Sequence, residues 1–212
     1  MSTDLALLVF VKYPEPGKVK TRLAKSLGYE RAAELYREFV TLTLQNCEQL
    51  AQAAHFATFT PPERKADLLA MFPGEWHWFE QHAASDLGMR IQYAFETLFK
   101  LGYRRVLTIG TDSPSLPLAY LEEAAEKLLE YDVVLGPAED GGYYLIGLKV
   151  APRELFEGIA WSTEKVLTQT LGIIQRLGLS VHLLPQWYDV DDVAALEKLS
   201  AVLPKVKRFF TI

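Results

Sequence analysis

Residues 104–148 read RRVLTIGTDSPSLPLAYLEEAAEKLLEYDVVLGPAEDGGYYLIGL, and this stretch decides the fold. Two short apolar runs, Val106–Ile109 and Val133–Leu135, flank a segment from Pro117 to Tyr131 whose apolar residues have helical spacing. Short β-branched runs separated by a helix predict a strand–helix–strand unit in a parallel sheet. Glycine, proline and acidic residues follow each run directly, so each strand is expected to end there.

Carboxylates stand at the end of both predicted strands. Asp112 lies in Gly-Thr-Asp-Ser-Pro after the first run, and Glu139 and Asp140 precede Gly-Gly-Tyr at 141–143 after the second. In open α/β sheets, ligands bind at the carboxyl ends of strands. The three acids therefore mark a candidate site at this edge of the sheet.

The remaining pattern predicts one α/β domain over residues 1–212, because no linker, repeat or low-complexity segment interrupts the chain. The apolar run Leu5–Val11 has the composition of a central parallel strand. Further apolar periodicity predicts helices at 30–54, 63–71, 85–101, 164–177 and 193–203, and strands at 55–60, 76–79, 143–148 and 181–184.

Composition limits the function classes. The 27 acidic and 22 basic residues give a net charge of −5, which argues against broad nucleic-acid binding. The single cysteine, Cys47, permits no intrachain disulfide and fits a reducing compartment. Leu5–Val11 is too short to span a membrane, and no basic segment precedes it. We expect a cytoplasmic protein without a membrane span, and the oligomeric state stays open.

A basic loop follows the first predicted strand. Two prolines and Gly17 prevent regular structure between residues 12 and 22. Four cations lie in this loop: Lys12, Lys18, Lys20 and Arg22. A loop that leads into a helix can hold a phosphate through backbone N–H groups and cationic side chains. A solvated basic loop is the alternative, but the position after the first strand favours phosphate binding, and the P-loop pattern is absent.

Acids also gather before the last predicted helix. Asp189, Asp191 and Asp192 lie within four residues and would repel one another if crowded. One of them is a natural helix cap, and a cation would relieve the others. Mg²⁺ is usually bound by one or two carboxylates together with substrate phosphates. An ion held by Asp112 and Asp191 would bridge a diphosphate, with the basic loop neutralising the remaining charge.

Other polar residues near predicted helix starts have a structural interpretation. Ser85 or Asp86 is expected to cap the helix that follows, although Gly88 and Arg90 could instead face a ligand. Residues 162–163, Ser-Thr, are expected to cap the helix 164–177 in the same way.

Together these motifs resemble the GT-A, nucleotide-diphospho-sugar transferase superfamily. The chain is similar to bacterial GT-A glycosyltransferase-like proteins linked to arsenosugar biosynthesis, which are themselves similar to phospholactate guanylyltransferase and the molybdenum-cofactor nucleotidyltransferases. The resemblance runs nearly end to end. It rests on KYPEPGKVKTRL (12–23), DLGMR (86–90), GTDSPSLP (110–117), GPAEDGGYYLIGL (136–148), WST (161–163) and DVDD (189–192).

The resemblance implies a three-layer α/β/α sandwich with a mainly parallel, Rossmann-like central sheet that binds a nucleotide. It implies Mg²⁺ or Mn²⁺ at Asp112, with Asp191 as second ligand and Asp189 as the alternative. The residues implied to bind the nucleotide are Lys12, Gly17, Lys18, Lys20 and Arg22. Those implied to face the sugar or acceptor are Glu139, Asp140, Gly141, Gly142 and Tyr143.

Three functions are open. A glycosyltransferase would pass a sugar from a nucleotide-diphospho-sugar to a small acceptor, with Asp140 or Glu139 as general base if the reaction inverts configuration. A nucleotidyltransferase would join a nucleoside triphosphate to its substrate and release pyrophosphate. Only one aspartate stands in Thr111-Asp112-Ser113, where many GT-A glycosyltransferases have two, and a single aspartate also fits nucleotidyl transfer. The third is a nucleotide-binding protein without turnover.

Overall fold

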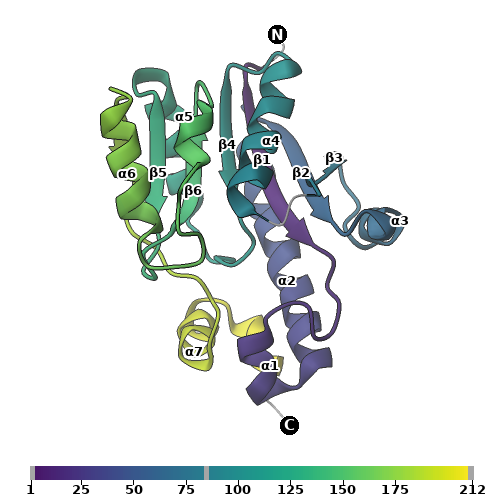
Figure 1. The fold of residues 1–212 in the computed structure, drawn as a ribbon. Helices are drawn as coiled ribbons and strands as arrows, with labels where there is room; N and C mark the ends of the chain where they lie inside the picture. The colour runs from purple at the N-terminus through teal and green to yellow at the C-terminus, as the bar shows by residue number, and fades with distance from the viewer. Residues whose placement is uncertain (1–2, 84–85, 210–212) are drawn as a thin grey trace.

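A computed structural model describes residues 3–83 and 86–209. Its centre is a seven-stranded sheet with the order β3-β2-β1-β4-β6-β5-β7 (Figure 1). Neighbouring strands are parallel except at β6, which is antiparallel to both β4 and β5. The strands are β1 (Leu5–Lys12), β2 (Ala54–Thr60), β3 (His77–Glu80), β4 (Arg105–Ile109), β5 (Val133–Pro137), β6 (Tyr143–Leu148) and β7 (Val181–Leu183).

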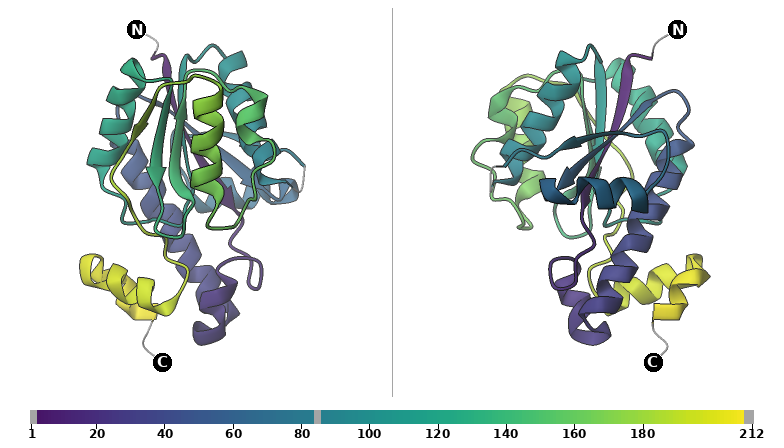
Figure 2. Two further views of the ribbon diagram at one scale, coloured as in Figure 1. Left: turned by 60° about the vertical axis from the view of Figure 1, so that its left-hand side comes forward. Right: turned by 90° about the vertical axis from the view of Figure 1, so that its right-hand side faces the viewer.

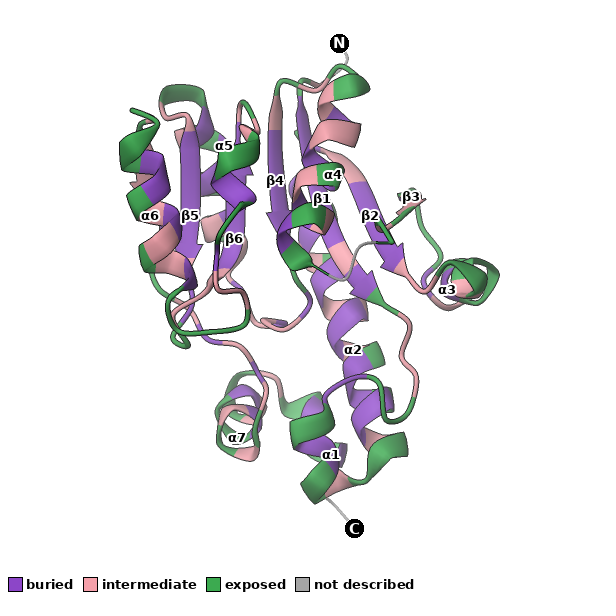
Figure 3. Ribbon diagram, in the orientation of Figure 1, coloured by how far each residue is buried: buried purple, intermediate pink, exposed green. Residues whose placement is uncertain are grey.

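Helices cover both faces of the sheet and make three layers, as the family resemblance implies. Alternate residues of β1 face opposite layers: Leu7 packs in a core with α2 and α5, and Leu8 packs in a second core with α4 and α6. The inner strands and the inner faces of these helices are buried, whereas the edge strands β3 and β7 are only partly covered (Figure 3). The helices are α1 (Thr21–Leu27), α2 (Tyr29–Glu48), α3 (Lys65–Met71), α4 (Leu87–Lys100), α5 (Leu118–Glu130), α6 (Val166–Arg176) and α7 (Val193–Val202).

The predicted strand–helix–strand unit is present as β4–α5–β5, but these two strands are not neighbours. Strand β6 returns between them after a turn at residues 138–142, where the Ala138 N–H donates to the Gly142 carbonyl at 3.0 Å. Gly141 has φ +88°, a backbone conformation that favours glycine. The hairpin therefore brings the Glu-Asp-Gly-Gly turn to the same edge of the sheet as Asp112.

One predicted helix boundary is wrong. The helix expected to reach residue 54 ends at Glu48, and short turn hydrogen bonds follow it up to Ala53. Leu50 is 2% exposed and belongs to the core although it lies after the end of the helix. The apolar spacing in the sequence therefore continues beyond the helix itself. Within the described residues, no helix is long and apolar enough to cross a membrane.

A small helical module extends beyond the carboxyl edge of the sheet (Figure 2). It consists of α1, the first turns of α2, α7 and the 3-10 helix η3 (Pro204–Phe209). Its separate apolar core includes Leu23, Phe39, Val190 and Leu196. This module lies below the strand ends in Figure 1. The loops that leave the carboxyl ends of the strands therefore lie between the sheet and the module.

Candidate functional site

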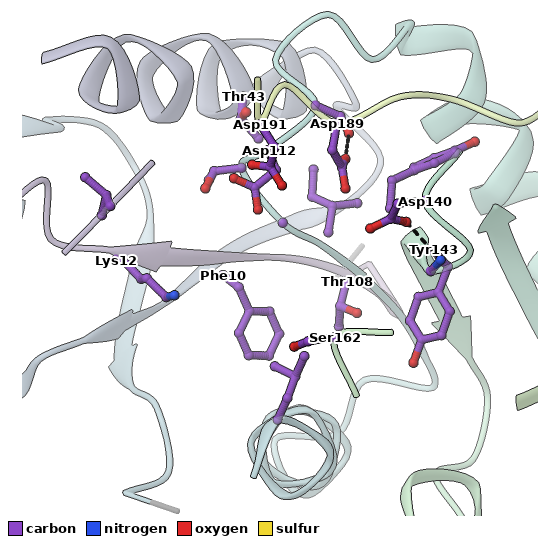
Figure 4. A pocket seen from close by; sticks show the side chains of 18 of the residues that line it. Phe10, Lys12, Thr43, Thr108, Asp112, Asp140, Tyr143, Ser162, Asp189 and Asp191 are labelled. Atoms are coloured by element: carbon purple, nitrogen blue, oxygen red, sulfur yellow. Dashed lines mark hydrogen bonds between the residues drawn. The ribbon is translucent and has the colours of Figure 1, made fainter. Parts of the chain in front are cut away.

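An open cavity of about 990 Å³ lies at this edge of the sheet. Residues from the end of β1, the loop after β4, the 138–142 turn and the segment before α7 line it, together with the start of α4. Asp112, from the loop after β4, and Asp189 and Asp191, from the segment before α7, point to one side of it (Figure 4). The fold thus brings together the acids that the sequence places apart.

A buried lysine joins two of these acids. The Lys20 ammonium lies 2.5 Å from Asp112 Oδ1 and 2.9 Å from Asp191 Oδ1, and it donates to the Val190 carbonyl at 2.8 Å. Its side chain is 2% exposed, whereas those of Asp112 and Asp191 are 50% and 47% exposed. Burial alone would lower the pKa of Lys20, but the two carboxylates outweigh it and raise that pKa above its ordinary value.

Backbone contacts fix the position of this triad. Strand β4 ends before Gly110, and the Asp112 carbonyl accepts a hydrogen bond of 2.8 Å from the Val190 N–H. The buried Tyr36 hydroxyl oxygen accepts from the Lys12 N–H at 3.0 Å and from the Thr111 hydroxyl at 2.9 Å. The ends of β1 and β4 and the segment before α7 are therefore held together before any ligand binds.

Asp189 has a different environment from Asp112 and Asp191. The Ser113 hydroxyl donates to Asp189 Oδ1 at 2.5 Å. Burial, assisted by the negative charges of Asp112 and Asp140, raises the pKa of Asp189 to about 6, although the Ser113 hydrogen bond opposes the shift. This acid is therefore costly to ionise in the folded chain.

That cost predicts a stabilising substitution. An acid with a folded pKa above its unfolded value lowers stability as pH rises between the two values, here from about 4 to about 6. Asp189→Asn keeps an oxygen for Ser113, and we expect it to raise the free energy of unfolding by about 1 kcal/mol at pH 7 but not at pH 4. Urea denaturation in a chelator at both pH values measures this. An equal effect at both would contradict the assignment.

The basic loop divides into two kinds of cation. Lys12, Lys18 and Arg22 line the cavity with exposed side chains, and Arg22 Nη1 lies 4.0 Å from Asp191 Oδ2. Lys20 alone among the four is buried, and its backbone has φ +45°. Gly17 lies outside the cavity lining, at a turn with φ +82°.

Only some of the residues predicted to face the sugar or acceptor line the cavity. Asp140, Gly142 and Tyr143 line it, and Asp140 Oδ1 accepts from the Gly142 N–H at 2.9 Å. Glu139 is not among the lining residues, and its carboxylate lies 3.3 Å from the Lys198 ammonium on α7. Gly141 also lies outside the lining, with its backbone against that of Glu164.

One predicted helix cap is wrong. Helix α6 begins at Val166, after Lys165, so residues 162–163 precede it as a turn that lines the cavity. Ser162 has φ +64°, which is unusual for a residue other than glycine. The Trp-Ser-Thr motif at 161–163 could have indicated that this turn belongs to the site. Serine and threonine before a helix also fit helix capping, however, so the motif alone did not decide between the two.

The other predicted caps are confirmed where the structure describes them. Asp86 Oδ1 accepts from the Met89 N–H at 3.0 Å, and Asp192 Oδ1 accepts from the Ala195 N–H at 2.8 Å. Ser85, the alternative cap, lies outside the described residues. Arg90 lines the cavity, as do several residues that the sequence did not mark: Phe10, Tyr36, Thr43, Asn46, Gln81 and Leu87.

The acids at the cavity offer few ligands for a metal ion. Residues 3–83 and 86–209 contain no group of three or more His, Cys, Asp or Glu side chains that could hold a metal ion. Asp112 and Asp191 instead form a pair of half-exposed carboxylates at the cavity. Two carboxylates fit a Mg²⁺-like ion whose other ligands are waters and substrate phosphates.

Comparison with known proteins places the chain in a family. A family model described as "Uncharacterized protein conserved in bacteria (DUF2064)" matches residues 43–163. No curated protein matches the chain. The crystal structure of a candidate nucleotide-diphospho-sugar transferase from Desulfovibrio desulfuricans G20 is 38% identical, with a TM-score of 0.90, over 95% of this chain and 88% of that one.

More distant structures share the fold alone. CMP:2-keto-3-deoxy-manno-octonic acid synthetase, complexed with CTP, is 11% identical with a TM-score of 0.61, over 96% of this chain and 99% of that one. Rv0371c from Mycobacterium tuberculosis, in complex with manganese, is 13% identical with a TM-score of 0.58, over 94% and 98%. The fold is thus the α/β/α sandwich of nucleotide-sugar transferases and nucleotidyltransferases, and the chain belongs to the DUF2064 family of bacterial proteins.

Proposed function

We propose that this protein is a glycosyltransferase that binds a nucleotide-diphospho-sugar and transfers the sugar to a small acceptor. The observation that carries the proposal is the pairing of Asp112 and Asp191 by the buried ammonium of Lys20. The positive charge of Lys20 offsets the repulsion between the two carboxylates and keeps them close together. Two carboxylates held close together can bind the same cation. The related candidate transferase, at 38% identity, supports the same class.

Asp112 and Asp191 would hold Mg²⁺ or Mn²⁺, and Asp189 is the alternative ligand. Such an ion supplies charge stabilisation at the diphosphate of the leaving nucleotide. Lys12, Lys18 and Arg22 would bind the phosphate oxygens that the ion leaves uncompensated. Lys20 is a positioning residue in this scheme, because its contacts go to the acids and to the Val190 carbonyl.

Asp140 would accept the proton of the attacking acceptor hydroxyl if the configuration inverts. It lines the cavity, and its contact with the Gly142 N–H fixes the orientation of its carboxylate. Asp140 is preferred to Glu139 as this base, because Glu139 lies outside the cavity lining. Of the two acids in the turn at 138–142, Asp140 would therefore contact the acceptor.

A nucleotidyltransferase is the second candidate. It is favoured by the loop after β4, in which Asp112 has no second aspartate beside it and pairs through Lys20 with Asp191 from a distant segment. The same ion and cations would then stabilise a leaving pyrophosphate.

The products separate the two reactions. The chain is incubated with Mg²⁺, candidate acceptors and either nucleotide sugars or nucleoside triphosphates, and products are identified by mass spectrometry. Release of a nucleoside diphosphate from a nucleotide sugar supports glycosyl transfer, and pyrophosphate from a triphosphate supports nucleotidyl transfer. Nucleotide binding without either product would support a protein without turnover.

Asp140→Asn tests the base. Asparagine keeps an oxygen for the Gly142 N–H but cannot take the proton, so we expect the transfer rate to fall by about 10². Nucleotide binding should stay at the wild-type level. Glu139→Gln is the matched control, because it changes the neighbouring acid outside the cavity lining and should leave the rate unchanged. Equal losses in both variants would contradict the role of Asp140.

A further inference from the structure

The cavity wall opposite the acids has a different chemistry. Phe10 and Ser162 lie across the cavity from Asp112, Asp189 and Asp191 (Figure 4). Leu87, Ile91 and Trp161 also line the cavity. These apolar residues form a patch that has charged neighbours, because Lys12 lies near Phe10 and Arg90 also lines the cavity (Figure 4).

Apolar side chains on this wall are incompletely covered. Leu87, at the first position of α4, lines the cavity and is 40% exposed. Phe10 and Trp161 are half-buried and pack against the core that contains Ile91. A ligand group placed against them would remove apolar surface from water, which favours binding.

Two glycines allow the turn at 161–164 to approach this wall closely. A Cβ atom on Gly88 would lie 2.5 Å from the Phe156 carbonyl oxygen and 2.7 Å from Trp161 Nε1. A Cβ atom on Gly141 would lie 2.3 Å from the Glu164 carbonyl oxygen. The turn is therefore packed between the first turn of α4 and the 138–142 turn, and its position is fixed from both sides.

Ser162 has a costly backbone conformation in this turn. The left-handed conformation is unfavourable for a residue other than glycine, and such strain concentrates at functional sites. Glycine would avoid that cost at φ +64°, but it would have no hydroxyl for the cavity. The position thus pairs backbone strain with a polar group at a ligand-sized cavity.

We propose that this wall binds the acceptor, and that the acceptor is an alcohol with an apolar body, such as an aryl or alkyl group. The apolar body lies against Leu87, Ile91 and Phe10, and a hydroxyl group hydrogen-bonds to Ser162. The inference rests on the proposed function, since it places the second substrate beside the nucleotide site.

Phenyl β-D-glucoside and methyl β-D-glucoside test the proposal, because they share their hydroxyl groups and differ in the apolar group. Dissociation constants are measured by ligand-observed NMR. The wild-type chain should bind the phenyl compound about tenfold more tightly than the methyl compound. Leu87→Ser should abolish that preference. Met89→Ser is the matched control, since Met89 is 50% exposed on the same helical turn but does not line the cavity.

Ser162→Gly tests the hydroxyl separately. Glycine tolerates the observed φ, so the variant should unfold at no lower temperature, yet bind both glucosides about threefold more weakly. Equal binding of the two compounds by the wild type, no binding of either, or a phenyl preference that survives Leu87→Ser would overturn the proposal. Mg²⁺-dependent nucleotide binding, measured on the same variants, should be unchanged, and its absence in the wild type would instead count against the proposed function.

Discussion

Asp112→Asn combined with Asp191→Asn is expected to lower the free energy of unfolding by about 3 kcal/mol, because it leaves the Lys20 ammonium buried without a compensating charge. The cost should exceed that of Lys20→Met alone. Lys20→Met also removes a charge from the site, but it leaves two acids that are half-exposed, so water can solvate their charges. Urea denaturation of the three variants measures these differences.

The triple variant is the sharper test. Adding Lys20→Met to the double variant removes the uncompensated charge, so most of the lost stability should return. Lys18→Met is the matched control, because Lys18 is an exposed cation of the same loop, and its removal should change stability by no more than about 0.5 kcal/mol. A triple variant as unstable as the double variant would show that the buried ion pairs do not set the stability of this site.

Gly141→Ala is expected to have the largest single effect, a loss of about 4 kcal/mol. The residue has φ +88°, and a Cβ atom would lie 2.3 Å from the Glu164 carbonyl oxygen and 2.6 Å from its Cα. Both neighbours are backbone atoms that cannot rotate away. The 138–142 turn and the turn at 161–164 would have to separate. The free energy of unfolding, measured without nucleotide, should therefore fall together with the transfer activity.

Gly102→Ala separates the two causes. Gly102 has φ +97°, but nothing lies within 4 Å of the position its Cβ atom would take. Its substitution should therefore cost only the backbone term, about 1 kcal/mol. Thermal and urea unfolding of the two variants give the comparison. Similar losses in both would mean that the close approach to Glu164 contributes nothing.

The sequence predicts the strands well because each lies in a short apolar or alternating segment bounded by turn residues. All seven strands, including the short β3 and β7, overlap such a segment. The runs carry no information about strand direction, so the insertion of antiparallel β6 between β4 and β5 was not predicted. Its signal was local, in Gly141-Gly142, which makes the tight reversal.

The site could be located only in part. Asp112 and Asp140 were found because they directly follow strands, and strand ends converge at one edge of the sheet. The burial of Lys20 was not predictable, since its neighbours Lys18 and Arg22 have the same charge and stay exposed. The turn at Ser162 was missed because its residues also fit a helix cap, and only the fold shows that α6 starts later.

The most direct test of the nucleotide site is a thermal-shift measurement with nucleotide sugars and nucleoside triphosphates of several bases, with Mg²⁺ or with a chelator, on the wild type and Asp112→Asn. Each variant is compared with its own ligand-free midpoint. A ligand at a hundredfold excess over its Kd adds about 2.7 kcal/mol of stability. We expect a Mg²⁺-dependent rise in the unfolding temperature with nucleotides of one base, and we expect Asp112→Asn to lose it. No rise with any nucleotide, or a rise that survives Asp112→Asn, would contradict it.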